Sequence, residues 1–417
     1  MELNSHNLSI QQIINHYDSA GNKTKSIYYP SEEIIGKQSN IELTLYEKDG
    51  TVKEYFEIPF RSFTNNFMYL WYVRHTTYNS YVNLKTTNGA NVNIVAESNM
   101  FTNGGPAGAG ISTYGIQVGA SGSAATQSID TYKLAGQINH GTSAGQLSYS
   151  SMFDYNTLFE STGSYYFSLY RTFSNLSTEN VNVTEVGFVG NTYPFDYKIM
   201  FARDVKDSNG NDINITVSPA QILTVRYNFF FPKSSGLTTN FVVFLMAEMT
   251  YKNYSLIKLI NNSNVAPLAS TGGPSNRFYK YAYSPGPNGI NWNSIMVGSG
   301  SEPEAMENTQ LSNYYLHGTG SNELLLGASI TDGYTKIYSN SGSAVEFQHR
   351  RTFTNGSPNA IIVNESCQVT QNIIDSTNYV TDNTLSYKGI ILRKLTGEQI
   401  IASGSSLEIV YKWMMEA

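Results

Sequence analysis

The sequence predicts an all-β protein with two tandem, duplicated β-sandwich domains of the jelly-roll type, preceded by a short N-terminal arm that contains one helix. Three observations support this fold class: a composition that favours strands and turns, a succession of short alternating segments, and an internal repeat. At 417 residues, the chain is also too long for one ordinary hydrophobic core and suits two.

The composition is poor in charge and rich in residues that favour strands and turns. Only 14% of the residues are charged, whereas a soluble domain typically has about 25%. The 31 tyrosines and 34 glycines favour many strands joined by turns. The net charge is −6 and no run of Lys and Arg occurs, so we expect neither direct nucleic-acid binding nor a membrane-surface role. Cys367 is the single cysteine, which excludes an internal disulfide.

The N-terminal segment is predicted to hold the helix. Within residues 8–17, Ile10, Ile13, Ile14 and Tyr17 recur at helical spacing. This helix would either pack on a neighbouring surface or act as a docking arm.

No export signal or membrane span is expected. Residues 1–7 lack the basic segment followed by an apolar one that marks a signal peptide. The longest apolar run, residues 241–247, is far shorter than the roughly 20 residues that a membrane span needs.

Strand and turn patterns dominate after residue 40. Residues 42–46 and 51–58 flank an Asp-Gly pair and predict a β-hairpin. Near the C-terminus, Leu407, Ile409 and Tyr411 alternate with polar residues, which predicts a strand with one buried face.

An internal repeat determines the domain organisation. Matching segments occur in the same order in both halves. They are Asn66-Phe67 with Asn240-Phe241, Ile116–Gly119 with Ile295–Gly298, His140–Thr142 with His317–Thr319, Arg171–Asn175 with Arg351–Asn355, Val183–Glu185 with Val363–Glu365, Arg203 with Arg393, and Ile222–Tyr227 with Leu407–Tyr411. The pattern indicates a duplicated domain with loop insertions. We predict an arm and hairpin at 1–54, a first sandwich at 55–232 and a second at 233–417.

Charged residues that recur in both copies form the first candidate site. They are Arg171, Glu185 and Arg203 in the first copy and Arg351, Glu365 and Arg393 in the second. We expect each carboxylate to lie between two guanidinium groups, in a structural cluster that fixes strands across the sandwich. The alternative is a contact with a ligand or another subunit. Catalysis is disfavoured, because a carboxylate paired in this way loses basicity.

Other motifs favour structural roles over chemistry. His140 and His317 are expected to be turn histidines, not metal ligands. Residues 141–145 fit the GxSxG pattern, but no helical segment follows, as a nucleophile elbow requires. The acidic loop 204–212 is read as a polar turn, with calcium binding as the alternative. We therefore predict no catalytic residue, no metal and no cofactor.

Aromatic clusters form the second candidate site. They are Tyr69, Trp71 and Tyr72, and Phe278, Tyr279, Tyr281 and Tyr283. Three roles remain open for them: packing in the core, contact with another subunit, and binding of sugar rings.

A family resemblance adds a biological setting. The residues that carry it are Val118, Gly119, Leu134, Gly141, Arg171, Phe173, Asn175, Val183, Glu185, Val186, Gly187, Phe188, Arg203 and Tyr227. Their order resembles a repeat found in virion proteins of tailed bacteriophages. The second copy keeps Arg351, Phe353, Asn355, Glu365 and Arg393 but has Ser366-Cys367 in place of Val186-Gly187. The composition is similar to that of phages of low-GC hosts, including the crAss-like group.

The resemblance implies a non-enzymatic structural protein of the tail, neck or collar, which forms a ring or adaptor. Its partners would be other copies of itself and other virion proteins, and it would be assembled into the virion in the host cytoplasm. The alternative function is a host-recognition fibre or adhesin that binds a surface glycan. An enzyme is the least favoured class.

Overall fold

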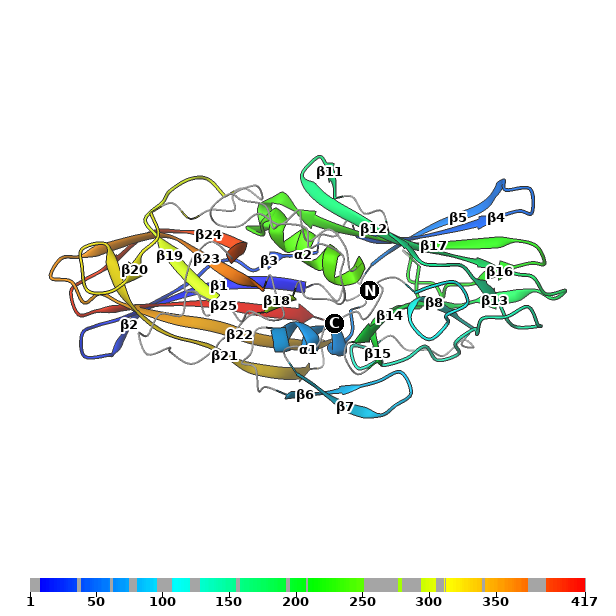
Figure 1. Cartoon of the computed structure of the whole chain (residues 1–417), viewed down its shortest axis with the longest axis horizontal. Coiled ribbons are helices and arrows are strands. Elements are labelled where there is room, and N and C mark those ends of the chain that lie inside the picture. The colour runs from blue at the N-terminus through cyan, green and yellow to red at the C-terminus, as the bar shows by residue number, and fades with distance from the viewer. Residues whose placement is uncertain are drawn as a thin grey trace.

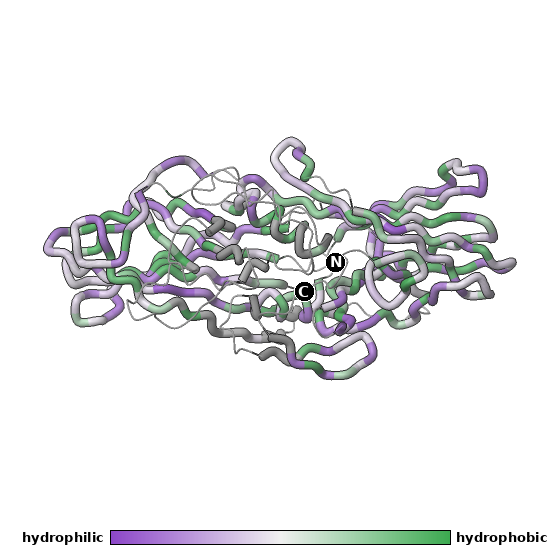
Figure 2. Tube along the Cα trace, in the orientation of Figure 1, coloured by the Kyte–Doolittle hydropathy of each residue, from purple (hydrophilic) through white to green (hydrophobic). Residues whose placement is uncertain are grey.

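The computed structural model describes residues 8–35, 39–60, 63–74, 81–95, 107–120, 128–154, 158–192, 196–207, 209–250, 277–279, 294–304, 311, 313–339, 342–373 and 388–416. These residues form an all-β fold of several sheets with two α-helices. Figure 1 shows an elongated molecule with two β-rich lobes and with both helices between them. Figure 2 shows hydrophobic residues along the strands and hydrophilic residues gathered in the turns at both ends.

The first half contains one large sheet that packs on a smaller one. The large sheet has the order β10-β12-β17-β4-β5, with β9 and β11 also paired to β12, and the small sheet has the order β15-β14-β8. The elements of this half are β4 (Asn40–Tyr46), β5 (Val52–Pro59), α1 (Asn65–Arg74), β6 (Tyr81–Lys85), β7 (Asn91–Val95), β8 (Gly115–Gly119), β9 (Ser148–Tyr149), β10 (Phe153–Asp154), β11 (Phe159–Ser161), β12 (Ser164–Ser174), β13 (Val181–Val183), β14 (Glu185–Thr192), β15 (Tyr197–Asp204), β16 (Ile215–Val217) and β17 (Ile222–Pro232).

The second half also contains a large sheet and a smaller one. Its large sheet has the order β2-β1-β25-β22-β21-β20, with β3 also paired to β1, and its small sheet has the order β18-β23-β19, with β24 paired to β23. The elements are β1 (Leu8–Tyr17), β2 (Lys23–Tyr28), β3 (Glu32–Glu33), the 3-10 turn Lys233–Ser235, α2 (Thr239–Thr250), β18 (Arg277–Tyr279), β19 (Ser294–Gly298), β20 (Leu316–His317), β21 (Glu323–Ser339), β22 (Gly342–Thr354), β23 (Ile361–Ile373), β24 (Lys388–Ile401) and β25 (Ser406–Glu416).

Equivalent strands in the two halves occupy equivalent positions. In the first half, Arg171 of β12 lies opposite Val225 of β17, which lies opposite Leu43 of β4. In the second half, Arg351 of β22 lies opposite Ile409 of β25, which lies opposite Ile14 of β1. The two recurring arginines thus lie at corresponding positions of the two large sheets, whereas the duplication of whole domains stays a prediction.

The predicted helix at residues 8–17 is wrong, because this segment is strand β1. It pairs antiparallel with β25 along its whole length, from Leu8 opposite Met415 to Tyr17 opposite Ser406. The sequence fits both periods, because Leu8, Ile10 and Ile14 also alternate along a strand and are all buried. Its β-branched isoleucines and the open edge of β25 favour the strand.

The segment predicted as an arm supplies strands to both halves. The first hairpin, β1–β2, completes the large sheet of the second half, whereas the hairpin β4–β5 completes that of the first half. The hairpin predicted at residues 42–58 is confirmed by this pairing. The N-terminal strand therefore lies beside the C-terminal strand, almost the whole chain length away in sequence.

Buried aromatic side chains join the two halves. Trp71 of α1 contacts Trp413 of β25 and Phe241 of α2, with ring centroids 5.3 and 5.4 Å apart. The ring centroid of Phe241 also lies 6.0 Å from that of Phe231 of β17. These residues belong to one hydrophobic core cluster that runs through both halves.

The pairing of β1 predicts different effects for two adjacent isoleucines. Ile14 is fully buried, so Ile14→Ala should lower the free energy of unfolding by about 2–5 kcal/mol. Ile13 is on the opposite, outer face and is only partly buried, so Ile13→Ala should have less than half this effect. Urea denaturation of both variants measures the difference. A helix would bury Ile13 together with Ile14. Equal losses of unfolding free energy in the two variants would therefore contradict the assignment of residues 8–17 to a strand.

Candidate functional site

A buried ion pair lies at the same place in each half. In the first half, Nε of Arg203 is 2.7 Å from Oε2 of Glu185, and both side chains are buried. The backbone N–H groups of Ala135 and Gly136 also donate to the Glu185 carboxylate, at 3.1 and 2.8 Å. These three donors stabilise its negative charge in the interior.

The pair in the second half has different additional partners. Nε of Arg393 donates to Oε2 of Glu365 at 2.8 Å, and both side chains are buried. Arg393 also donates to the backbone carbonyls of Pro303 and Glu302, at 3.1 and 3.0 Å. Both arginines therefore connect the central strand of a small sheet to its neighbour.

A glycine lies opposite each glutamate, and in the first half it makes room for the carboxylate. Glu185 lies opposite Gly119, and Glu365 lies opposite Gly298. A Cβ at residue 119 would lie only 2.5 Å from Oε1 of Glu185, which no side chain tolerates. This close approach explains why the repeat has glycine at that position.

Arg171 does not join the ion pair, contrary to the expected cluster of one carboxylate and two guanidinium groups. Its guanidinium group donates to the backbone carbonyls of Ser150, Tyr114, Ile116, Gly108 and Ile111, at distances between 2.6 and 3.3 Å. The prediction was wrong because Arg171 and Arg203 come from different sheets of the sandwich.

Arg351 resembles Arg171 in its contacts. It donates to the carbonyls of Gly327 and Ile295, both at 3.0 Å. Burial lowers the pKa of each of the two guanidinium groups to about 10, so both remain cationic at neutral pH. Each arginine thus ties a large-sheet strand to the backbone of the small sheet, and its positive charge faces carbonyl oxygens instead of solvent.

The recurring asparagine of each half also forms hydrogen bonds with backbone carbonyl groups. The side-chain amide of Asn175 donates to the carbonyls of Glu179 and Val217, both at 2.7 Å. Asn355 repeats this pattern with Asn359 and Ile401. The Arg-x-Phe-x-Asn spacing marked this residue, but its role in closing a loop was visible only in the structure.

The two histidines behave as the predicted turn residues. Nδ1 of His140 accepts a hydrogen bond from the backbone N–H of Tyr149 at 3.0 Å. Nδ1 of His317 accepts the equivalent bond from Leu326 at 3.1 Å. Both rings therefore fix a turn against the following strand.

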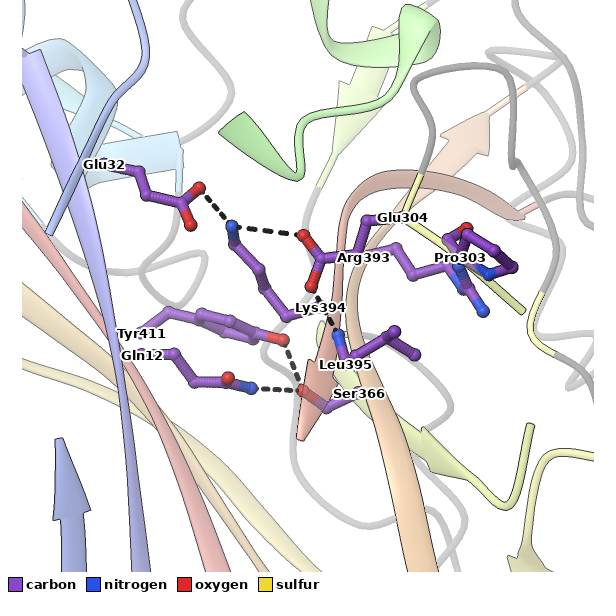
Figure 3. A network of polar contacts seen from close by, with 9 residues as sticks. All are labelled: Gln12, Glu32, Pro303, Glu304, Ser366, Arg393, Lys394, Leu395 and Tyr411. Atoms are coloured by element: carbon purple, nitrogen blue, oxygen red, sulfur yellow. Dashed lines mark hydrogen bonds and ion pairs between the residues drawn. The ribbon is translucent and has the colours of Figure 1, made fainter. Parts of the chain in front are cut away.

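A polar network links the N-terminal strands to the opposite sheet of the second half (Figure 3). The amide of Gln12 donates to Oγ of Ser366 at 2.6 Å, and this hydroxyl lies 2.7 Å from that of Tyr411. Lys394 bridges Glu32 and Glu304. Burial raises the pKa of Tyr411 well above its usual value, so its hydroxyl stays neutral and can donate or accept.

The loop that fits GxSxG does not have the geometry of a nucleophile elbow. Ser143 is exposed, and the loop leads into strand β9, whereas an elbow leads into a helix.

The acidic loop does not bring its carboxylates together. Asp207 accepts from the backbone N–H groups of Asn209 and Asn211, and Asp212 pairs with Lys206. Across the described residues, no group of three or more His, Cys, Asp or Glu side chains has the arrangement of a metal site.

The first of the predicted aromatic clusters packs against the hydrophobic core. Tyr69, Trp71 and Tyr72 lie on α1, where Trp71 is only 2% exposed and belongs to the core. The proposed interface or sugar-binding role is therefore wrong for Trp71. Phe278 and Tyr279 lie on β18, whereas Tyr281 and Tyr283 lie outside the described residues.

A different aromatic surface covers the outer side of the large sheet in the first half; we call it the aromatic face. It consists of two rows of side chains on neighbouring strands: Phe153, Tyr170 and Arg226 in one, and Phe159, Tyr166 and Phe230 in the other. Stacked rings in these rows are 4.7 to 5.3 Å apart. The sequence did not predict the aromatic face, because each of its rows is made of residues from strands that are distant in the chain.

Hydrogen-bonded amides lie between the two rows of the aromatic face. Oγ of Ser168 donates to the side-chain carbonyl of Asn228 at 2.5 Å, and the side-chain N–H of Asn228 donates to Oδ1 of Asn40 at 2.7 Å. Arg226 lies over the ring of Tyr170 and pairs with Glu42 at 3.4 Å. The charges of this surface are thus compensated locally.

Comparisons with protein-family models, curated proteins and solved structures found no match. Within the described part of the chain, no helix is long and apolar enough to cross a membrane.

Removal of one ion-pair partner should strongly destabilise the fold. Arg203→Met should lower the free energy of unfolding by about 3–5 kcal/mol, because the Glu185 carboxyl group would stay buried without its cationic partner. The exposed pair of Lys206 and Asp212 provides the control, and Lys206→Met should change stability by only about 0–1 kcal/mol. If chemical denaturation showed an equally small loss of stability for both variants, it would contradict the structural role of the buried pair.

Proposed function

We propose that this chain is a non-enzymatic structural protein of a bacteriophage virion, which forms a ring or adaptor in the tail, neck or collar. The observation that carries the proposal is the pairing of β1 with β25, which closes the chain into one body with a continuous core. A body of this kind suits a part that transmits load through its surface. The virion setting rests on the resemblance in the Arg-x-Phe-x-Asn and Val-x-Glu-Val-Gly segments.

The recurring charged residues support a structural role. Arg171, Glu185 and Arg203 are buried and are engaged with backbone groups or with each other. Groups held in this way fix the sheets relative to one another, and they are not presented to a substrate. The two similar lobes would offer related surfaces to neighbouring copies, as ring-forming proteins require.

The proposal predicts self-assembly and incorporation into particles. The purified protein should form closed oligomers that are visible by negative-stain microscopy, and an antibody against it should label purified virions at one defined position. A protein that remains monomeric at high concentration and is absent from virions would contradict the proposal.

Glycan binding by the aromatic face is the second candidate. Phe153 is 46% exposed at the end of one aromatic row, and hydrogen-bonding amides lie beside that row. Aromatic rings pack on the apolar faces of sugar rings, and amides bind sugar hydroxyl groups. In the second half, Arg350 takes the position of Tyr170 and pairs with Glu408, so the sandwich itself does not require aromatic residues here.

This candidate predicts a localised loss of binding. Phe153→Ala and Tyr170→Ala should each reduce retention on a glycan array by at least tenfold, whereas Arg350→Ala at the equivalent position of the second half should leave retention unchanged. If none of the proteins shows saturable binding to any glycan, the aromatic face has another role.

A further inference from the structure

Each N-terminal hairpin ends in a strand at the edge of a large sheet. Among the described strands, β2 pairs only with β1, and β5 pairs only with β4. Such edges leave backbone N–H and C=O groups on one side without a strand partner. Large apolar side chains are exposed on both: Tyr28 is 67% exposed on β2, and Val52 and Tyr55 are 59% and 54% exposed on β5.

The two edges differ in charge. Strand β2 carries Lys23 and Lys25 and no acidic residue. Strand β5 carries Glu54 and Glu57 against the single basic residue Lys53, which lies 3.8 Å from Glu47. Residues that lie opposite each other on paired strands repel when their charges are alike and attract when they are unlike.

These charges select one kind of edge contact. Pairing of β2 with another β2 would bring lysines together, and pairing of β5 with another β5 would bring glutamates together. The contact of β2 with β5 is the one in which the two strands have opposite net charges, because β2 has two lysines whereas β5 has two glutamates and one lysine. The charged edges thus act against symmetric dimers and against unspecific sheet extension, while one contact stays favourable.

The two edges lie at opposite ends of the molecule. In Figure 1, β2 extends to the end of the lobe formed by the second half, and β5 extends to the end of the lobe formed by the first half. A contact between them must therefore join two different copies. A contact between different surfaces repeats from copy to copy, and it produces a ring when the rotation closes or a filament when it does not.

We propose that β2 of one copy pairs with β5 of the next, so that the large sheets continue from copy to copy. The partner is a second copy of this chain, and the contact is strand addition with electrostatic selection. The pairing would extend over six residues of β2, which is about 20 Å of strand. This inference rests on the proposed function, because it names the surface through which the oligomer forms.

Charge reversal provides the test in the full-length protein. One variant carries Lys23→Glu and Lys25→Glu, so that both of its edges are acidic. The other carries Glu54→Lys and Glu57→Gln, so that both of its edges are basic. Because the reversed side chains are exposed, both variants should fold with the unfolding midpoint of the wild type.

Self-association of each variant alone should weaken by about a hundredfold, because like charges then face each other. An equimolar mixture should recover the oligomer, because the acidic β2 of one variant meets the basic β5 of the other. Mass photometry measures all four samples. The wild-type oligomer should also weaken as salt rises to 1 M, since the charges are exposed.

The outcomes separate this inference from the proposed function. If the wild type assembles and each variant alone assembles equally well, the edge contact is wrong and the assembly role stands. If the variants are monomeric and the mixture stays monomeric, charge pairing between β2 and β5 is also wrong. If the wild type itself is monomeric at every concentration and salt, both proposals fail.

Discussion

The pairing of the first described strand with the last determines the rest of this structure. Strand β1 covers the edge of β25 over ten residues, and Leu8, Ile10 and Ile14 fill the core beneath it. The second half therefore cannot complete its large sheet from its own part of the chain. Because β4 continues from the same segment into the first half, both lobes depend on the N-terminal forty to sixty residues. The aromatic contacts around Trp71 and Trp413 then join the lobes into one core.

Buried polar groups fix the geometry within each lobe. A cation in the interior is stable only where oxygen atoms surround it, and Arg171 meets this condition with backbone carbonyls, whereas Arg203 meets it with Glu185. Arg171 holds segments that are distant in the chain, whereas Arg203 and Glu185 join the consecutive strands β15 and β14. Apolar contacts alone are less directional, so these groups account for the recurrence of the same few charged residues in a chain otherwise poor in charge.

The sequence predicted those features that depend on local patterns. Local patterns identified the hairpin of residues 42–58 and the buried face of Leu407, Ile409 and Tyr411, because a strand with one buried side has an apolar residue at every second position. The repeat marked Arg171, Glu185 and Asn175 as important. It did not give their partners, because the loop carbonyls around Arg171 come from residues about 20 to 60 positions away, in loops with no distinctive composition.

The errors share a physical cause. Residues 8–17 fit a helix and a strand equally well, and only the distant edge of β25 decides between them. The sequence left core and surface roles open for Trp71, and only the contact of its helix with the other half places it in the core. The aromatic face was missed because Phe153, Tyr170 and Phe230 become neighbours only when β10, β12 and β17 pair.

Hydrogen exchange of the full-length protein tests the central pairing most directly. If β1 and β25 form one ladder, the amides of residues 8–17 and 406–416 that bond across it should be strongly protected and should share one opening free energy, which falls together as denaturant is added. Exchange of residues 8–17 at the rate of an unstructured chain, with residues 406–416 still fully protected, would contradict the account.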